Sequence, residues 1–304
     1  MSETDAARDS MVAPSSNGRR RGMKKKKMVG SLGVVITGGS RGLGYALALE
    51  FLAAGDRVVI CGRNPGRLDE AIQTLQQAVP SGEVYGIVCD AGNPSGGREL
   101  AAFAAERLGR VDRWINNAGT AGLFKRPLWE LHAEDILETC TTNLSGSVML
   151  CAEAVRVMDR QPLSPEPVYH IFNMGFSSIG AKFSRSALSH KASKRGVAEL
   201  THFLYRELKA AGKTSIGVHE VSPGLVLTDL LFQDATEEAM RFFSVIAERA
   251  EKVASVLVPK IREITRRTSR IRYQPLVMMF FRLLIGMKVV IGKPKEVGRA
   301  KGHS

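Results

Sequence analysis

A glycine-rich turn near residue 40 has the composition of a phosphate-binding loop. Residues 37–44 read TGGSRGLG and lie between a short apolar run and an amphipathic stretch. Glycines at such a strand-to-helix junction let backbone amides and the first turn of the helix approach a pyrophosphate. Tight turns also use glycine, so the position of the cluster favours a nucleotide site more than the glycines themselves do. The predicted cofactor contacts are Thr37, Gly38, Ser40, Arg41, Gly42, Leu43 and Gly44.

Basic side chains stand where an NAD site would carry an acidic one. Such a site places an Asp or Glu about 20 residues further on, against the ribose 2′-hydroxyl. Here the second apolar run ends in Arg63, and Arg41 lies in the glycine turn. Two guanidinium groups without a carboxylate suit a 2′-phosphate, so we predict NADPH as the cofactor. The alternative is that both arginines are merely exposed. Asp90, after the third run, is predicted to accept a hydrogen bond from the adenine amino group.

Short apolar runs alternate with helical stretches through most of the chain. Runs rich in β-branched residues lie at 34–37, 57–61, 84–89, 113–115, 168–173 and 216–221. Helical patterns cover 45–54, 67–78, 97–108, 133–160, 187–211 and 236–264. This alternation is typical of a parallel sheet with helices on both faces. We therefore predict one doubly wound, Rossmann-type α/β domain with basic tails.

Charge is concentrated at the two ends of the chain. The 304 residues carry a net charge of +13. Residues 1–28 hold eight basic and three acidic side chains, and residues 241–304 hold fifteen and four. Basic ends suggest contact with an anionic surface, or they are solvated tails. Residues 1–28 are predicted to be disordered, and their composition leaves open whether they are the remnant of a transit peptide.

The sequence predicts neither a metal site nor a membrane span. The four cysteines (Cys61, Cys89, Cys140 and Cys151) lie far apart and lack the spacing of a zinc site. We expect them to be small buried apolar residues in a reducing compartment. No apolar run approaches the ~18 residues of a transmembrane helix.

A second motif, NNAG at residues 116–119, follows the fourth predicted strand. The pattern T-G-x-x-x-G-x-G with N-N-A-G about eighty residues later resembles the short-chain dehydrogenase/reductase family. The resemblance continues through Asn143 in TTNLSG, Lys194, and Pro223-Gly224, and it covers about residues 30–230. It implies the doubly wound fold predicted above and an oxidoreductase that uses a nicotinamide cofactor.

The resemblance also implies a catalytic set. Enzymes of this family reduce a carbonyl with a hydride from nicotinamide and a proton from a tyrosine, which stands four residues before a lysine. By this resemblance Lys194 would bind the nicotinamide ribose, and Asn143 would hold a water in the proton relay. Ser177, with Ser178 as the alternative, would polarise the substrate oxygen. The further cofactor residues that it implies are Asn117, Ala118, Gly119, Lys194, Pro223, Gly224, Val226 and Thr228.

The proton-donor position holds His190 in place of tyrosine. Imidazole, with an ordinary pKa of ~6.5, can donate a proton near neutral pH, although a neighbouring ammonium disfavours its charged form. The alternative is that the acid is lost and the chain binds NADPH with little or no turnover. A literal Y-x-x-x-K occurs at Tyr205 and Lys209, but Lys209 precedes Pro223 by only 14 residues. That leaves the helix no room to end before the sixth strand, so this pair is not predicted to be catalytic.

A narrower resemblance is carried by segments that the wider family leaves variable. GYALALEFLAAGDRVVICGR, YHIFNM, and the block from PGLVLTDLL to IREI are most similar to chlorophyll(ide) b reductases of plants and green algae. Those chloroplast enzymes reduce the 7-formyl group of chlorophyll(ide) b to 7-hydroxymethyl with NADPH, in chlorophyll b degradation. The resemblance implies this activity and a location in the chloroplast, peripheral to the thylakoid membrane.

The predicted domain organisation follows from the same comparison. Residues 29–265 would form the reductase domain, with a substrate lid at about 230–265, and residues 266–304 a basic apolar extension. The apolar segment 275–293 carries interspersed basic residues, which suits a membrane interface. Packing on the core or on a second subunit is the alternative. The family's usual assembly through long helices such as 187–211 implies a homo- or hetero-oligomer, and no nucleic-acid partner is expected.

Two other functions stay open. The protein could be an NADPH-dependent reductase of another bulky carbonyl, such as a steroid, a retinoid or a fatty aldehyde. It could also be a catalytically silent NADPH-binding partner subunit, because His190 replaces the usual tyrosine.

Overall fold

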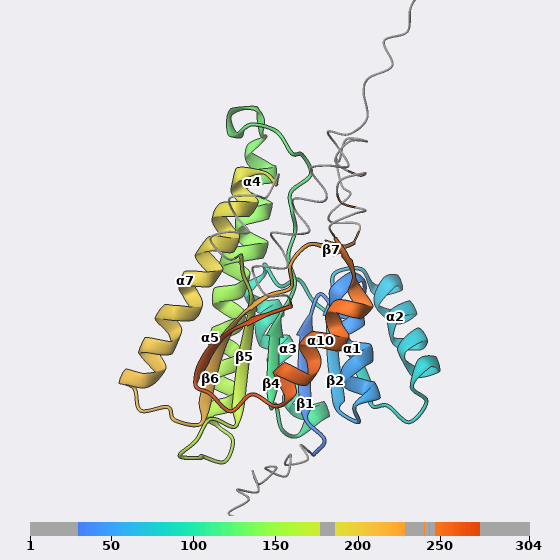
Figure 1. The fold of residues 1–304 in the computed structure, drawn as a ribbon, viewed down its shortest axis with the longest axis vertical. Coiled ribbons are helices and arrows are strands. Elements are labelled where there is room, and N and C mark those ends of the chain that lie inside the picture. The colour runs from blue at the N-terminus through green and yellow to red at the C-terminus, as the bar shows by residue number, and fades with distance from the viewer. Residues whose placement is uncertain (1–29, 177–185, 229–239, 241–242, 244–246, 274–304) are drawn as a thin grey trace, which may run out of the picture.

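Seven parallel strands form the central sheet of the protein (Figure 1). The computed structural model describes residues 30–176, 186–228, 240, 243 and 247–273. In the order β3-β2-β1-β4-β5-β6-β9 the strands are Val84–Val88, Arg57–Gly62, Gly33–Thr37, Arg113–Asn116, Tyr169–Met174, Ile216–Ser222 and Thr268–Arg272. The doubly wound α/β fold predicted from the alternating runs is confirmed.

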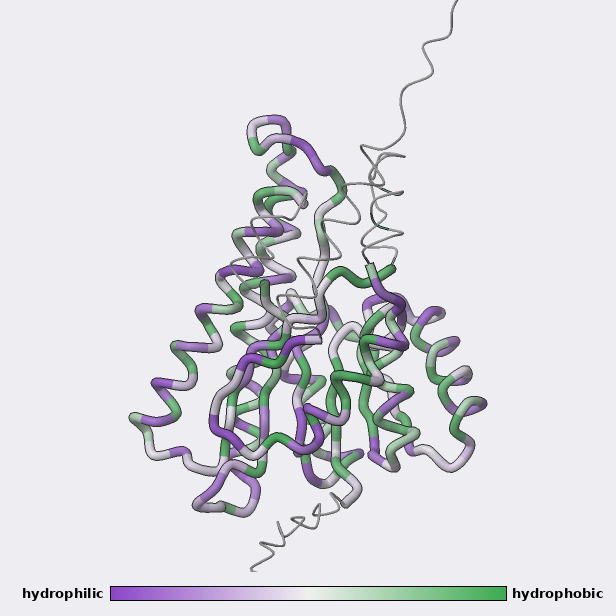
Figure 2. The backbone as a smooth tube through the Cα atoms, in the orientation of Figure 1, coloured by the Kyte–Doolittle hydropathy of each residue, from purple (hydrophilic) through white to green (hydrophobic). Residues whose placement is uncertain are grey.

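Helices cover both faces of this sheet, and each face has its own core. On one face lie α1 (Gly42–Ala53), α2 (Pro65–Ala78) and α10 (Ala250–Arg262). On the other lie α3 (Pro94–Leu108), α5 (Gly146–Asp159) and α7 (Leu188–Ala210). The inner strands β2, β1, β4 and β5 are buried on both faces, so they are mostly apolar instead of alternating, whereas the edge strands β3 and β9 are partly exposed. Hydrophobic residues concentrate in the sheet, whereas hydrophilic and hydrophobic residues alternate along the turns of α2 and α7 (Figure 2).

The helical stretch predicted at 133–160 is divided by a wider turn. Helix α4 (Ala133–Cys140) passes into a π-helical turn, Thr141–Ser145, before α5 begins. A π-turn breaks the regular i to i−4 bonding, and such turns are frequent at functional sites. The carbonyl of Asn143 accepts a hydrogen bond from the Ser147 hydroxyl at 2.6 Å. The interruption therefore falls at Asn143, a predicted catalytic residue, and Ser147 holds the backbone of that residue.

Helix α10 corrects part of the predicted lid. That lid extended to residue 265, but α10 packs in the same core as α1, with Val253, Leu257 and Ile261 fully buried. Their spacing of four residues places them on one helical face. This segment is therefore a core helix, and the part of the predicted lid that it occupies is wrong.

Strand β9 extends the folded domain beyond the predicted boundary at residue 265. Ile271 is buried and is the register partner of Val221 in β6. A short parallel pair, β7 (Val226–Leu227) with β8 (Glu248–Arg249), joins the chain that follows β6 to the chain that precedes α10. The predicted disordered segment 1–28 and the apolar segment 275–293 lie outside the described residues.

Two histidines form a buried polar contact within the sheet. His170 Nδ1 in β5 and His219 Nε2 in β6 share a hydrogen bond of 2.9 Å, and His219 Nδ1 lies 2.9 Å from Ser269 Oγ. Burial and the nearby Arg113 guanidinium lower the pKa of His170 to about 2 and that of His219 to about 3. Both side chains are therefore neutral and serve as a polar contact between neighbouring strands.

The remaining expectations concern metals, membranes and cysteines. Within the described ranges, no cluster of His, Cys, Asp and Glu could hold a metal, and no helix is long and apolar enough to span a membrane. All four cysteines are free. Cys61, Cys89 and Cys151 are buried as predicted, whereas Cys140 is partly exposed.

Candidate active site

The predicted site residues gather at the carboxyl ends of the strands. The chain builds outward from β1 to β3 and then returns to β4 on the other side of β1. Loops that follow β1 and β4 therefore diverge to opposite faces and leave a crevice, which is where doubly wound folds bind ligands. Of the predicted residues, Ser177 and its alternative Ser178 lie outside the described part of the chain.

The glycine turn exposes the N-terminus of α1 at this crevice. Gly38 and Gly42 have φ of +64° and +57°, a region that favours glycine. A Cβ on Gly44 would lie 2.1 Å from the Gly38 carbonyl oxygen, so α1 approaches the turn too closely for any other residue. The first turn of α1 carries no acidic residue, and Arg41 at its N-cap makes no capping bond. Such a positive helix end fits the pyrophosphate of a dinucleotide.

The NNAG motif braces that turn from the end of β4. The Thr37 hydroxyl accepts hydrogen bonds from the backbone amides of Asn117 and Ala118, each at 3.0 Å. The Asn117 side chain donates to the carbonyls of Thr37 and Gly38 at 3.0 and 3.1 Å. These four residues are thus engaged within the protein and fix the shape of the turn. Their direct contact with a cofactor stays a prediction.

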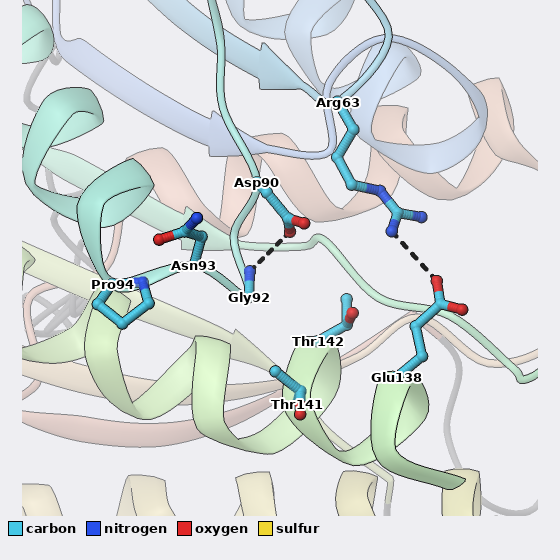
Figure 3. A pocket seen from close by; sticks show the side chains of 8 residues that line it. All are labelled: Arg63, Asp90, Gly92, Asn93, Pro94, Glu138, Thr141 and Thr142. Carbon is cyan, nitrogen blue, oxygen red and sulfur yellow. Dashed lines mark hydrogen bonds and ion pairs between the residues drawn. The ribbon is translucent and has the colours of Figure 1, made fainter. Parts of the chain in front are cut away.

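A pocket of about 390 Å³ lies beyond the ends of β2 and β3 (Figure 3). Arg63, predicted to hold a 2′-phosphate, donates from Nη1 to Glu138 Oε1 of α4 at 3.1 Å. Asp90 Oδ1, predicted to face the adenine, accepts from the Gly92 amide at 2.8 Å. Glu138 was not among the residues predicted from the sequence, because no local motif marks a residue that meets Arg63 from 75 positions away. The eight lining residues are Arg63, Asp90, Gly92, Asn93, Pro94, Glu138, Thr141 and Thr142.

Lys194 and Asn143 meet at Gly119. A Cβ on Gly119 would lie 2.9 Å from Asn143 Oδ1 and 3.0 Å from Lys194 Nζ, so a side chain here would have to displace the ends of both groups. Lys194 Nζ donates to the carbonyl of Met174 at 3.2 Å, and burial lowers its pKa to about 8. At neutral pH the ammonium form therefore still predominates.

The Asn143 amide is fully engaged. Its Oδ1 accepts from the Thr120 amide at 2.9 Å, while its Nδ2 donates to the Thr120 carbonyl at 2.9 Å and to Ser193 Oγ at 3.1 Å. This exchange fixes the loop after β4 against the π-helical turn and α7. The structure thus gives the Asn143 side chain a bracing role, and its predicted contact with a relay water is untested.

His190 lies one turn before Lys194 on α7 and is 6% exposed. Its ring is edge-on to Phe176, with centroids 5.1 Å apart, and its Nδ1 has no partner among the described residues. Burial, together with the positive charges of Lys194 and Lys125, lowers its pKa to about 3. At neutral pH His190 is therefore neutral. In this form it can exchange hydrogen bonds with a ligand, but it is not an imidazolium acid.

The literal Y-x-x-x-K pair lies away from this cluster. Tyr205 is 15 residues beyond His190 on α7, which corresponds to about 22 Å at 1.5 Å per residue. Tyr205 packs beside the core of that face, and Lys209 lies in the last turn of the helix. Helix α7 ends at Ala210, directly after Lys209, so this pair lies at the far end of the helix from His190, and its exclusion from the site stays a prediction.

The segment after β6 reaches the glycine turn. A Cβ on Gly42 would lie 3.1 Å from Thr228 Cγ2, so Thr228 lies directly beside the start of α1. Val226 is in β7, and Gly224, with φ of +81°, turns the chain after Pro223. Four predicted cofactor residues thus lie between β6 and the crevice.

Comparisons with known proteins match this chain to one family. A model of the short chain dehydrogenase family matches residues 33–239. The chain is 39% identical over 267 residues to "Chlorophyll(ide) b reductase NOL, chloroplastic" of Oryza sativa subsp. japonica, covering 87% of this chain and 75% of that protein. It is 42% identical over 243 residues to the protein of the same name from Arabidopsis thaliana, covering 79% and 68%. "Probable chlorophyll(ide) b reductase NYC1, chloroplastic" of Oryza sativa subsp. japonica is 38% identical over 259 residues, and the chain spans 50% of its length.

Solved structures share the fold. Levodione reductase superposes with a TM-score of 0.67 at 23% identity, covering 79% of this chain and 94% of that one. A 3-oxoacyl-[acyl-carrier protein] reductase from Brucella melitensis in complex with NAD gives a TM-score of 0.65 at 22% identity, with the same coverage.

Proposed function

Because the chain belongs to the short-chain dehydrogenase family, we propose that it reduces the 7-formyl group of chlorophyll(ide) b to 7-hydroxymethyl with NADPH. The observation that carries this proposal is its identity of 39–42% with two chlorophyll(ide) b reductases over most of its length. A nicotinamide dinucleotide supplies the hydride when bound.

The geometry suggests how the chain holds that dinucleotide. The N-terminus of α1 would receive the pyrophosphate, and the buried Lys194 ammonium beside Gly119 would bind the nicotinamide ribose. Arg63 supports the choice of NADPH, because its guanidinium projects into the pocket beyond β2. Asp90, Pro223, Val226 and Thr228 would complete the cofactor site.

The proton chemistry must differ from that of a tyrosine enzyme. A neutral imidazole can polarise a carbonyl as a hydrogen-bond donor, as in triosephosphate isomerase. We propose that His190 donates such a bond to the formyl oxygen and passes its proton to the oxygen as hydride reaches the carbon. Lys194, one helical turn away and mostly protonated at neutral pH, would return the proton to the imidazole.

The pigment assay tests this function directly. Purified protein is incubated with chlorophyllide b and NADPH, and the absorption spectrum is followed for the 7-hydroxymethyl product. Product formation supports the proposal. Reduction of other bulky aldehydes without reduction of chlorophyllide b would instead identify a reductase of a different carbonyl.

One observation favours a second candidate. The low pKa of His190 removes the imidazolium acid, so the chain could bind NADPH as a silent subunit of an active relative. NADPH binding in wild type and in His190→Tyr, with turnover only in the variant, would establish this role.

We also propose a chloroplast location at the periphery of the thylakoid membrane, and assembly into a homo- or hetero-oligomer. The names of the plant relatives support the chloroplast. Fractionation of chloroplasts with and without a salt wash, and light scattering of the purified protein, test these two statements.

A further inference from the structure

The Arg63–Glu138 ion pair crosses the pocket beyond β2 and β3. Arg63 follows β2, Glu138 lies near the end of α4, and their side chains point toward each other in Figure 3. The Nη1–Oε1 distance is 3.1 Å, and the side chains are 54% and 46% exposed. An ion pair this exposed contributes little to stability, so a ligand that binds the guanidinium more strongly can displace the carboxylate.

The two carboxylates of the pocket differ in whether they interact with Arg63. Among the eight described lining residues Arg63 is the one basic side chain, while Asp90 and Glu138 are acidic. Asp90 accepts a hydrogen bond from the Gly92 amide, which holds it away from Arg63 in the pocket wall. Glu138 instead accepts a hydrogen bond from the Arg63 guanidinium and forms an ion pair with it. Any anion that binds this guanidinium must therefore displace Glu138 or share Arg63 with it.

We propose that Glu138 is a specificity-determining residue that opposes binding of the 2′-phosphate of NADPH. A phosphate monoester of charge about −2 competes for the guanidinium that Glu138 holds, and it is repelled by the carboxylate after binding. NADH carries a neutral 2′-hydroxyl at this position. It therefore competes less for the Arg63 guanidinium and is repelled less by the Glu138 carboxylate. Glu138 thus lowers the affinity for NADPH more than the affinity for NADH, and it reduces the preference of the site for NADPH. The inference rests on the proposed use of NADPH.

Neutralising Glu138 tests the inference by binding alone. The affinities of wild type and Glu138→Gln for NADPH and NADH are measured by the fluorescence of the nicotinamide ring. Adenosine 2′,5′-bisphosphate and 5′-AMP are titrated by calorimetry to isolate the adenosine half. Removing a half-exposed charge of this kind is expected to tighten NADPH and the bisphosphate about two- to fivefold. The affinities for NADH and 5′-AMP should change by less than half of that factor.

Glu134→Gln is the matched control. Glu134 lies one turn earlier on α4, is exposed and does not line the pocket, so it carries the same charge on the same helix. Its neutralisation should leave all four affinities near wild type. Because Glu138 is exposed, the melting temperature of Glu138→Gln should also match wild type.

The outcomes separate this inference from the proposed function. Unchanged or weaker NADPH binding by Glu138→Gln overturns the inference, as does equal tightening of NADH or equal tightening in Glu134→Gln. If wild type binds NADPH and only the Glu138 effect is missing, the proposed function stands. If wild type binds neither dinucleotide, the proposed function fails and the inference fails with it.

Discussion

Replacing His190 by phenylalanine tests the proposed chemistry most directly. Phenylalanine keeps an aromatic ring for the edge-on contact with Phe176 and removes both nitrogens. It also removes the Nδ1 that has no partner among the described residues, and an unsatisfied buried polar atom is destabilising. The variant is therefore expected to fold at least as stably as wild type, so lost activity would not reflect lost structure.

The expected magnitude follows from the protonation state. With a pKa of about 3, the fraction of imidazolium at pH 7 is about 10⁻⁴. The donor must then be the neutral ring, which acts as one preorganised hydrogen-bond donor. Removing such a donor lowers kcat by about 10²–10³. The affinity for NADPH should stay within about twofold of wild type, because the cofactor contacts assigned above belong to other residues.

The assay is the rate of chlorophyllide b reduction under saturating NADPH from pH 5.5 to 8. Wild type should show no inflection near pH 6.5, because the buried imidazole does not titrate there. His190→Tyr, which restores the usual donor, serves as the active control. Two results would refute the reasoning. One is equal turnover in wild type and His190→Phe. The other is a wild-type inflection near pH 6.5 that disappears in the variant.

Four further outcomes are expected. Gly119→Ala should lower kcat about 10²-fold in the same assay, because the added methyl would displace Lys194 and Asn143 from their positions in the proposed site; full activity would contradict this proposal. His170 and His219 stay neutral in the fold but bind protons below pH ~6.5 when unfolded, so the free energy of unfolding should fall as pH drops from about 6.5 toward 3. Urea titrations at pH 7 and 5 measure this loss, and equal stability at both would oppose it. Leu257→Ala should lower the free energy of unfolding by about 2–5 kcal/mol, since α10 is a core helix, whereas a lid residue would cost little. Tyr205→Phe should leave the rate of chlorophyllide b reduction unchanged, and a large loss would restore the literal motif.

The strands and the glycine turn could be predicted because each has a local signature. A short apolar β-branched run predicts a buried parallel strand. The glycines mark a close approach between α1 and the turn before it, which any side chain would prevent. Strand β9 escaped prediction because it lies at the edge of the sheet. Its sequence TSRIR buries Ile271 alone, while Arg270 is exposed and pairs with Glu220. Such a strand carries little hydrophobic signal.

The candidate site could be assembled from the sequence as a set of residues, whereas its electrostatics could not. Spacing and resemblance identified Lys194 and His190, but the pKa of about 3 depends on burial and on Lys125 from the loop after β4. The position of Glu138 opposite Arg63 likewise depends on how α4 meets the end of β2. The lid boundary was wrong because the resemblance grouped α10 with the segment before it, although its apolar spacing already indicated a helix with one buried face.

The β7–β8 pair gives α10 a second attachment to the framework. Val226 is the register partner of Glu248, and Leu227 that of Arg249. The chain therefore leaves the framework and returns to it at neighbouring points, between a sheet strand and a core helix. The Glu248 amide also donates to the Leu225 carbonyl at 2.9 Å. The start of α10 is thus tied to the chain after β6 by backbone hydrogen bonds as well as to α1 by packing, and a substitution that disturbs one of these two attachments leaves the other to hold the helix in place.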